Sequence, residues 1–124
     1  MLSEVNRRVV ETMHDPEVFN FFVKCIQRCC PKSEKQTVAE LKVTVDFFEN
    51  FCGDRVRFLA HSERQPGDHA GQFNTSYRWP YGSVAVITPF NFPIEIPVLQ
   101  FCGALFMGNK PIIKGDNRTN FVLE

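Results

Sequence analysis

The sequence predicts an α/β fold in three consecutive parts, and three observations support it. Apolar residues recur at helical spacing through residues 1–53, with capping signals before two of the helices. The spacing changes to an alternating, β-type pattern over residues 54–80, which predicts a hairpin. Residues 81–124 then contain a buried-type strand, a proline-rich loop, a helix and a second strand, which together predict a parallel βαβ unit.

The N-terminal helices are predicted from their start and stop signals. Asp15, Pro16 and Glu17 combine an N-cap acceptor, a proline at the first helical position and an acid near the positive helix end. The sequence SEKQ at 33–36 has the capping-box form and predicts the start of a third helix. Gly53 is placed to end that helix in the left-handed conformation. The apolar positions of these helices are Val5, Val9, Val10, Met13, Val18, Phe19, Phe22, Val23, Ile26, Val38, Leu41, Val45, Phe48 and Phe51.

The hairpin is predicted between Val56 and Trp79. The segments RVRFLA at 55–60 and QFNTSYRW at 72–79 both alternate and are rich in β-forming residues. The sequence QPGDHAG, which lies between them, has the composition of a turn. We therefore expect two strands joined by a loop.

The last part of the chain predicts a strand, a helix and a second strand. SVAVI at 83–87 is an apolar run that suits a strand buried on both faces of a parallel sheet. The following helix is expected to begin near Ile94 and to end at Gly108. KPIIK at 110–114 predicts the second strand, and a further helix capped by Thr119 is expected after it. One such unit cannot close a sheet, because its strands need neighbours and its faces need helices.

Composition and charge exclude several classes of function. The 124 residues are 44% hydrophobic, which is too apolar for a disordered tail. The 14 acidic and 14 basic residues cancel, so no net field attracts nucleic acid or an anionic membrane. No apolar run reaches the roughly 18 residues that crossing a bilayer requires. The five cysteines form no CxxC pair and lie near no histidine at ligand spacing, so no metal site is expected.

Asn91 is the first candidate functional residue. It lies between two phenylalanines and two prolines, in the loop that follows the strand at 83–87. Open α/β sheets bind ligands at the carboxyl ends of their strands, and an amide there can donate to negative charge that develops on a substrate oxygen. The alternative is a structural asparagine that satisfies loop carbonyls or caps the next helix. The pattern alone leaves both readings open.

Lys114 and Asp116 are the second candidates. Lys114 closes the apolar strand at 110–114, where its ammonium can reach ribose hydroxyls or a phosphate, and Asp116 can accept from a ribose hydroxyl. The alternative is a solvated charge at the end of a strand. The sequence contains no GxGxxG motif and no Walker motif, and no histidine stands at a readable spacing from a serine or cysteine.

The segment VITPFNFPIEIPVLQFCGALFMGNKPIIK, residues 86–114, resembles the signature of the aldehyde dehydrogenase superfamily. The shared features are a P-[WF]-N-F-P loop after a strand, a helix that ends in G-N, and a strand that ends in lysine. The segments FFVKCIQRCCPKS, FFENFCGDRVRFLA, PGDHAGQ and YRWPYG are similar to one branch, the mitochondrial delta-1-pyrroline-5-carboxylate dehydrogenases of proline breakdown. The resemblance covers essentially all 124 residues.

The resemblance implies a role for individual residues and parts. Asn91 matches the oxyanion-hole asparagine, which binds the aldehyde oxygen as the thiohemiacetal forms. Lys114 matches the lysine that contacts the adenosine ribose of NAD, and Asp116 lies in the same loop. Residues 1–53 then form an N-terminal helical segment, 54–80 a hairpin of the oligomerisation domain, and 81–124 the start of a Rossmann-like NAD-binding domain. The residues that match the strand end and loop lining the NAD pocket are Ile87, Thr88, Pro89 and Phe90.

The sequence also departs from the family pattern. Most members continue the lysine as K-P-S-E, whereas this chain has KGDN, with Asn117 where a ribose-binding glutamate is common. The family's nucleophilic cysteine and general-base glutamate lie downstream of residue 124, and none of the five cysteines here matches the nucleophile. We therefore expect this chain to be inactive alone and to contribute to aldehyde oxidation, of glutamate 5-semialdehyde to glutamate, only as part of a complete enzyme.

Partners and location follow from the same resemblance. The hairpin implies a homo-oligomer, and the alternative to an enzyme part is a non-catalytic paralogue that associates with full-length subunits through it. The resemblance implies the mitochondrial matrix. The N-terminal sequence MLSEVNRR is not an arginine-rich presequence, so a targeting peptide is absent or lies upstream, and a chain that truly starts at Met1 would be cytoplasmic.

Overall fold

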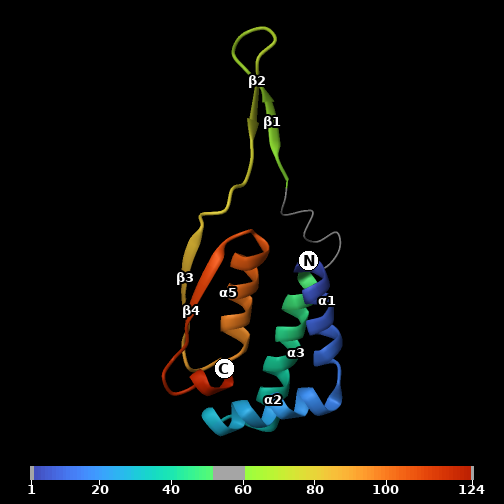
Figure 1. Ribbon diagram of the computed structural model, residues 1–124, viewed down its shortest axis with the longest axis vertical. Coiled ribbons are helices and arrows are strands. Elements are labelled where there is room, and N and C mark those ends of the chain that lie inside the picture. The colour runs from blue at the N-terminus through green and yellow to red at the C-terminus, as the bar shows by residue number, and fades with distance from the viewer. Residues whose placement is uncertain (1, 52–60, 124) are drawn as a thin grey trace.

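The computed structural model describes residues 2–51 and 61–123 and shows three helices, a hairpin and a βαβ unit (Figure 1). None of the helices within these ranges combines the length and the apolar character that crossing a membrane requires. The elements are α1 (Leu2–Met13), α2 (Pro16–Cys29), α3 (Glu34–Asn50), β1 (Glu63–Pro66), β2 (Phe73–Ser76), β3 (Ser83–Ile87), α5 (Glu95–Phe106), β4 (Lys110–Lys114) and the 3-10 helix η1 (Asn120–Val122).

The helix starts follow from local capping chemistry. The Asp15 carboxylate accepts from the Glu17 N–H at 2.8 Å, and Pro16 begins α2. Ser33 and Gln36 form a reciprocal capping box at the start of α3. Both predicted starts are confirmed, because each side chain satisfies an N–H that the first helical turn leaves unpaired. Gly53, the expected end of α3, lies outside the described residues.

The described part of the hairpin agrees with an antiparallel pair of strands but differs from the predicted bounds. The expected first strand, 55–60, lies outside the described residues, and a described strand, β1, occupies Glu63–Pro66. It pairs antiparallel with β2 in the register Glu63↔Ser76 to Pro66↔Phe73. The expected turn was therefore too long, since its first two residues belong to β1. Proline lacks an N–H but is tolerated in this two-stranded ribbon, where both strands are edges.

The βαβ unit agrees with the predicted order of elements. β3 and β4 are parallel, with the register Ser83↔Lys110 to Ile87↔Lys114. The turn after α5 ends at Gly108, whose φ of +82° is the left-handed conformation expected there. In Figure 1, α5 lies between the two-stranded sheet and α3, and it packs against both. The helix is thus the connection between the sheet and the helical half of the molecule.

The prediction that residues 83–87 are buried on both faces is wrong for the described chain. Within β3 only Val86 is fully buried, and Ile87 is 78% exposed. The apolar side chains of β4 are similar, since Ile112 and Ile113 are exposed. Among the described residues the sheet has two strands, and the helix that packs on it, α5, covers one face. The second apolar face therefore meets solvent.

The hydrophobic core lies between α2, α3 and the first turn of α5, and η1 packs onto it. The expected helix after Thr119 is instead the three-residue 3-10 helix η1, and the Thr119 side chain caps no N–H. A tight turn, with the Val122 N–H donating to the Thr119 carbonyl at 3.2 Å, places Val122 in the core against α2. The buried core residues are Val23, Ile26, Cys30, Leu41, Ile94 and Val122.

Candidate functional site at the carboxyl ends of the parallel strands

The parallel pairing of β3 and β4 brings the candidate residues to one end of the sheet. Ile87 and Lys114 are register partners, and the Thr88 N–H donates to the Lys114 carbonyl at 3.1 Å. The Asn91 loop, residues 88–94, and the loop after β4 therefore start side by side. This is the end of the sheet at which open α/β folds bind ligands.

The Asn91 loop places its asparagine in solvent. Asn91 is exposed, and the flanking rings of Phe90 and Phe92 are 44% and 38% exposed. Both rings are therefore partly open to solvent, and a cation lies over each of them. The Arg118 guanidinium lies 3.9 Å from the centroid of the Phe90 ring, and the Lys32 ammonium lies 3.8 Å from that of Phe92. In the sequence, Asn91 thus lies between two phenylalanines, and the side-chain cation of another residue lies over each of their rings.

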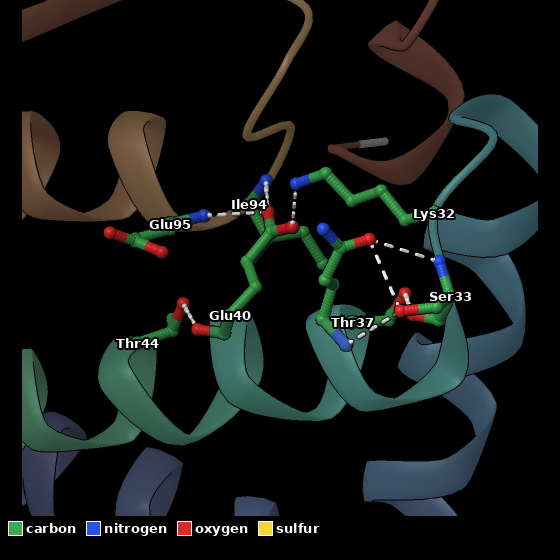
Figure 2. A network of polar contacts seen from close by, with 8 residues as sticks. Lys32, Ser33, Thr37, Glu40, Thr44, Ile94 and Glu95 are labelled. Carbon is green, nitrogen blue, oxygen red and sulfur yellow. Dashed lines mark hydrogen bonds and ion pairs between the residues drawn. The ribbon is translucent and has the colours of Figure 1, made fainter.

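The end of the Asn91 loop is fixed by a carboxylate from α3. Glu40 Oε1 accepts from the N–H groups of Ile94 and Glu95, at 3.0 and 3.3 Å. Its other oxygen, Oε2, lies 2.7 Å from Lys32 Nζ. Figure 2 shows Lys32 and Glu40 pointing toward one another beside the start of α5.

Sequence reasoning missed both Glu40 and Lys32. A signal for Glu40 was present, because it is a charged residue on the face of α3 that also carries the buried Thr37, Leu41 and Thr44. Charged residues are almost never fully buried unless they are paired. What the sequence could not supply was the partner, since the amide that Glu40 accepts from lies 54 residues away.

The loop after β4 carries a compact set of charges. Lys114 Nζ donates to Asn117 Oδ1 at 3.5 Å. Asp116 binds the Arg118 guanidinium through both oxygens, at 2.9 and 3.2 Å. Hydrogen bonds from the Arg118 side chain and backbone hold the pKa of Asp116 at about 2, so the carboxylate is ionised at neutral pH. The structure therefore groups Lys114 and Asp116 in one loop, with Asp116 already engaged by a cation.

The hydroxyl of Thr88 is enclosed at the strand end. Thr88 is buried, and its Oγ1 has no hydrogen-bond partner among the described residues. An unpaired buried hydroxyl costs about 1–3 kcal/mol of stability. The exposed Lys114 ammonium is a donor of the kind that can reach sugar hydroxyls at this end of the sheet. Lys114 therefore fits the ribose part of a dinucleotide.

The described cysteines do not form part of this site. Cys102 is fully buried on α5, and burial raises the pKa of its thiol to about 12, so the thiol is protonated and inert. Burial, followed by the nearby Cys25 and Cys30, also raises the pKa of Cys29. Cys52 lies outside the described residues. No cluster of three or more metal-ligating side chains occurs in the part of the chain that the structure describes.

Comparison with curated proteins identifies close relatives over the whole chain. A probable aldehyde dehydrogenase of Linum usitatissimum is 51% identical over 124 residues, and these residues span 22% of its length. The mitochondrial delta-1-pyrroline-5-carboxylate dehydrogenase 12A1 of Arabidopsis thaliana is 50% identical over 124 residues, again 22% of its length. The chain thus spans about a fifth of the length of the curated relatives it matches.

Solved structures share the fold. A structure described as a methylmalonate-semialdehyde dehydrogenase of Sinorhizobium meliloti, complexed with NAD, matches with a TM-score of 0.84 and 29% identity, over 97% of this chain and 24% of that one. An NADP-dependent enzyme of E. coli matches with a TM-score of 0.85 and 22% identity, over 96% of this chain and 24% of that one, which shows the fold alone.

The sequence family agrees with both comparisons. The model of the aldehyde dehydrogenase family matches residues 8–124. The expected resemblance is confirmed, and this chain belongs to the aldehyde dehydrogenase family.

Proposed function

We propose that this chain supplies the oxyanion-binding loop and the first part of the cofactor site of an NAD-dependent aldehyde dehydrogenase. The observation that carries the proposal is Asn91, exposed on the loop that leaves β3 beside Lys114. Its amide can donate to the aldehyde oxygen as negative charge develops there, and it carries no charge that must be neutralised first.

The proposed substrate is glutamate 5-semialdehyde, the open form of 1-pyrroline-5-carboxylate, which is oxidised to glutamate in proline breakdown. The support is the 50% identity over the whole chain to the Arabidopsis delta-1-pyrroline-5-carboxylate dehydrogenase. The same relative, which is named as mitochondrial, supports the mitochondrial matrix as the location.

The proposed cofactor-binding residues lie at the ends of β3 and β4. We assign the adenosine ribose of NAD to Lys114, with Asp116 in the same loop. A bound NAD supplies the acceptor for the hydride that leaves the aldehyde carbon. The NAD complex of the Sinorhizobium relative supports this choice of cofactor. The residues assigned to the wall of the pocket are Ile87, Thr88, Pro89 and Phe90.

The proposed division of labour follows the three parts of the chain. Residues 1–53 are a helical segment, 54–80 a hairpin of the oligomerisation domain, and 81–124 the start of the NAD-binding domain. In this proposal no cysteine of this chain is the thiolate nucleophile, and no glutamate of this chain is the general base. Without a thiolate no thiohemiacetal forms, and without a base the thioester is not hydrolysed.

A chimera tests the role of Asn91. The 124 residues would replace the matching segment of the Arabidopsis enzyme, and NADH production from 1-pyrroline-5-carboxylate would be followed. We expect Asn91→Ala to lower kcat by about 100-fold to 1000-fold, the cost of losing one oxyanion donor. The matched control is Asn20→Ala, at an exposed asparagine of α2. An Asn91→Ala chimera with the kcat of its parent would refute the proposed role.

The chain by itself gives a second test. Purified residues 1–124 should produce no NADH when mixed with NAD and an aldehyde, since the nucleophile and base are assigned elsewhere. Absorbance of NADH over time is the measurement, with the Arabidopsis enzyme as the positive control. Aldehyde-dependent turnover by the 124 residues alone would contradict the assignment.

A non-catalytic, associating role is the second candidate, and the hairpin favours it. Figure 1 shows β1 and β2 projecting away from the helices, and all residues of both strands are exposed. Phe73 and Trp79 are exposed on and just after β2, so the ribbon offers apolar surface as well as unpaired strand edges. Co-purification with a full-length aldehyde dehydrogenase, lost in a Phe73→Ser/Trp79→Ser variant, would support this role. A monodisperse monomer that binds no such subunit would argue against it.

A further inference from the structure

Glu40 joins two distant parts of the chain through one fully buried carboxylate. Its side chain is 0% exposed, and the Lys32 side chain that pairs with it is 13% exposed. The same carboxylate accepts from two consecutive N–H groups, those of Ile94 and Glu95. A buried charge is tolerated when it is paired and its lone pairs are satisfied, and both conditions are met here.

The first turn of α5 needs this contact, because the helix has no cap of its own. The N-cap position is Ile94, whose side chain can accept no hydrogen bond. Glu40 supplies the missing acceptor from α3, and it places a negative charge at the positive end of α5. The point at which the Asn91 loop becomes α5 is therefore set by a residue of another helix.

Lys32 holds the same loop three residues earlier. Its ammonium pairs with Glu40 at 2.7 Å and also lies over the ring of Phe92, the residue that follows Asn91. Lys32 directly precedes Ser33, and the capping box of α3 fixes the backbone at this position. Figure 2 shows Ser33, the N-cap of α3, next to Lys32, whose side chain points toward Glu40.

We propose that Glu40 and Lys32 are positioning residues that hold Asn91 in place, and we call the pair the Lys32–Glu40 clamp. Glu40 fixes the loop at residues 94 and 95, and Lys32 fixes it at Phe92. The segment that directly follows Asn91 is therefore held at two points. The catalytic meaning of the clamp rests on the role proposed for Asn91. The mechanical role, ordering of the loop, does not depend on it.

Amide hydrogen exchange and ¹⁵N relaxation on the 124-residue chain test the clamp. Glu40→Leu removes both acceptor oxygens, and we expect exchange at the Ile94 and Glu95 amides to accelerate roughly 10-fold to 100-fold, the loss of hydrogen bonds to a charged group. The order parameter of the Asn91 backbone should fall from the rigid range, about 0.85, toward the flexible range, below about 0.6. The control is Glu34→Leu, at an exposed acid in the first turn of the same helix.

Two gentler variants separate the clamp from general stability. Glu40→Gln keeps one acceptor oxygen, so it should retain part of the protection at Ile94 and Glu95. Lys32→Met keeps the length of the side chain without its charge, and it should loosen Asn91 while protection persists at Leu41 in the core. If Glu40→Leu fails to fold, these two variants decide the outcome. Loss of protection at Ile94 and Glu95 with an unchanged order parameter at Asn91 would overturn the proposal, as would no change at all.

The catalytic consequence is measured separately in the chimera with the Arabidopsis enzyme. If Asn91 is the oxyanion donor, Lys32→Met and Glu40→Gln should lower kcat more than they raise KM. A clamp variant with unchanged kcat, in a chimera that Asn91→Ala inactivates, would overturn positioning and leave the proposed function intact. If instead Asn91→Ala is fully active, the proposed function fails, and the exchange and relaxation data still decide whether the clamp orders the loop.

Discussion

The helical half of the molecule and the two-stranded sheet differ in how deeply their side chains are buried. In the helical half, Ile26 and Leu41 are fully buried, and even the carboxylate of Glu40 has three partners. In the sheet, apolar residues of the same kind, such as Ile87 and Ile112, face solvent. The comparison teaches that an apolar pattern predicts an element well, whereas burial depends on what packs against that element.

The largest expected effect contrasts a core leucine with a sheet isoleucine. Leu41→Ala removes a fully buried side chain and should lower the free energy of unfolding by about 2–5 kcal/mol. Ile112→Ala, at a side chain that is 66% exposed, should change it by about 0.5 kcal/mol or less. Urea unfolding followed by circular dichroism measures both. If both variants lost the same free energy of unfolding, the sheet face would be covered in solution and would not differ from the helical core.

An intermediate effect is expected at the capping box of α3. Ser33→Ala removes the acceptor for the Gln36 N–H and should cost about 1 kcal/mol of the free energy of unfolding. Thr75→Ala, at an exposed threonine of β2, is the control and should leave helix unfolding unchanged. The midpoint of urea unfolding reports both variants. A Ser33→Ala variant as stable as its parent would show that the helical half does not depend on this cap.

The smallest effect is a difference in pH dependence between two exposed or partly exposed carboxylates. Hydrogen bonds from Arg118 lower the pKa of Asp116 from 3.8 to about 2, so its contribution to stability is present above about pH 4 and is lost as pH falls toward 2. Burial, and then the nearby Glu40 carboxylate, raise the pKa of Glu95 above 4.5, so protonation of Glu95 favours the folded state as pH falls. The two groups therefore act in opposite directions in acid.

NMR titration of the side-chain carboxyl carbons of Asp116 and Glu95 checks this prediction. Arg118→Gln should return the Asp116 pKa toward 3.8 and leave Glu95 unchanged, which makes Glu95 the internal control. An Asp116 that titrates at its ordinary value in the parent chain would show that the pair with Arg118 does not persist in solution.

The features that the sequence predicted correctly are those with local causes. Asp15, Ser33 and Gly108 each act on residues within one helical turn, so their motifs are complete in the sequence. The order of strands and helix around the Asn91 loop was predictable for the same reason. The family resemblance added the roles assigned to Asn91 and Lys114, which no local rule supplies.

The features that the sequence missed have distant causes. The two amides that donate to Glu40 lie 54 and 55 residues away, so the sequence near Glu40 does not predict these contacts. Burial of β3 was expected on both faces, although α5 covers only one. A helix capped by Thr119 was expected, yet the Thr119 side chain caps no N–H, and residues 120–122 form a 3-10 turn that packs against α2. In each case tertiary packing overrides a local pattern.

The separation of Glu40 from Ile94 also has a kinetic consequence. The capping box of α3 closes a loop of a few residues, whereas the Glu40 contact must close one of 54. Loop closure costs more entropy as the loop lengthens, and contacts of long sequence separation slow folding. We therefore expect α3 to form early and the Asn91 loop to be ordered late. The segment that carries the proposed oxyanion donor would then be among the last parts of the molecule to reach its final shape.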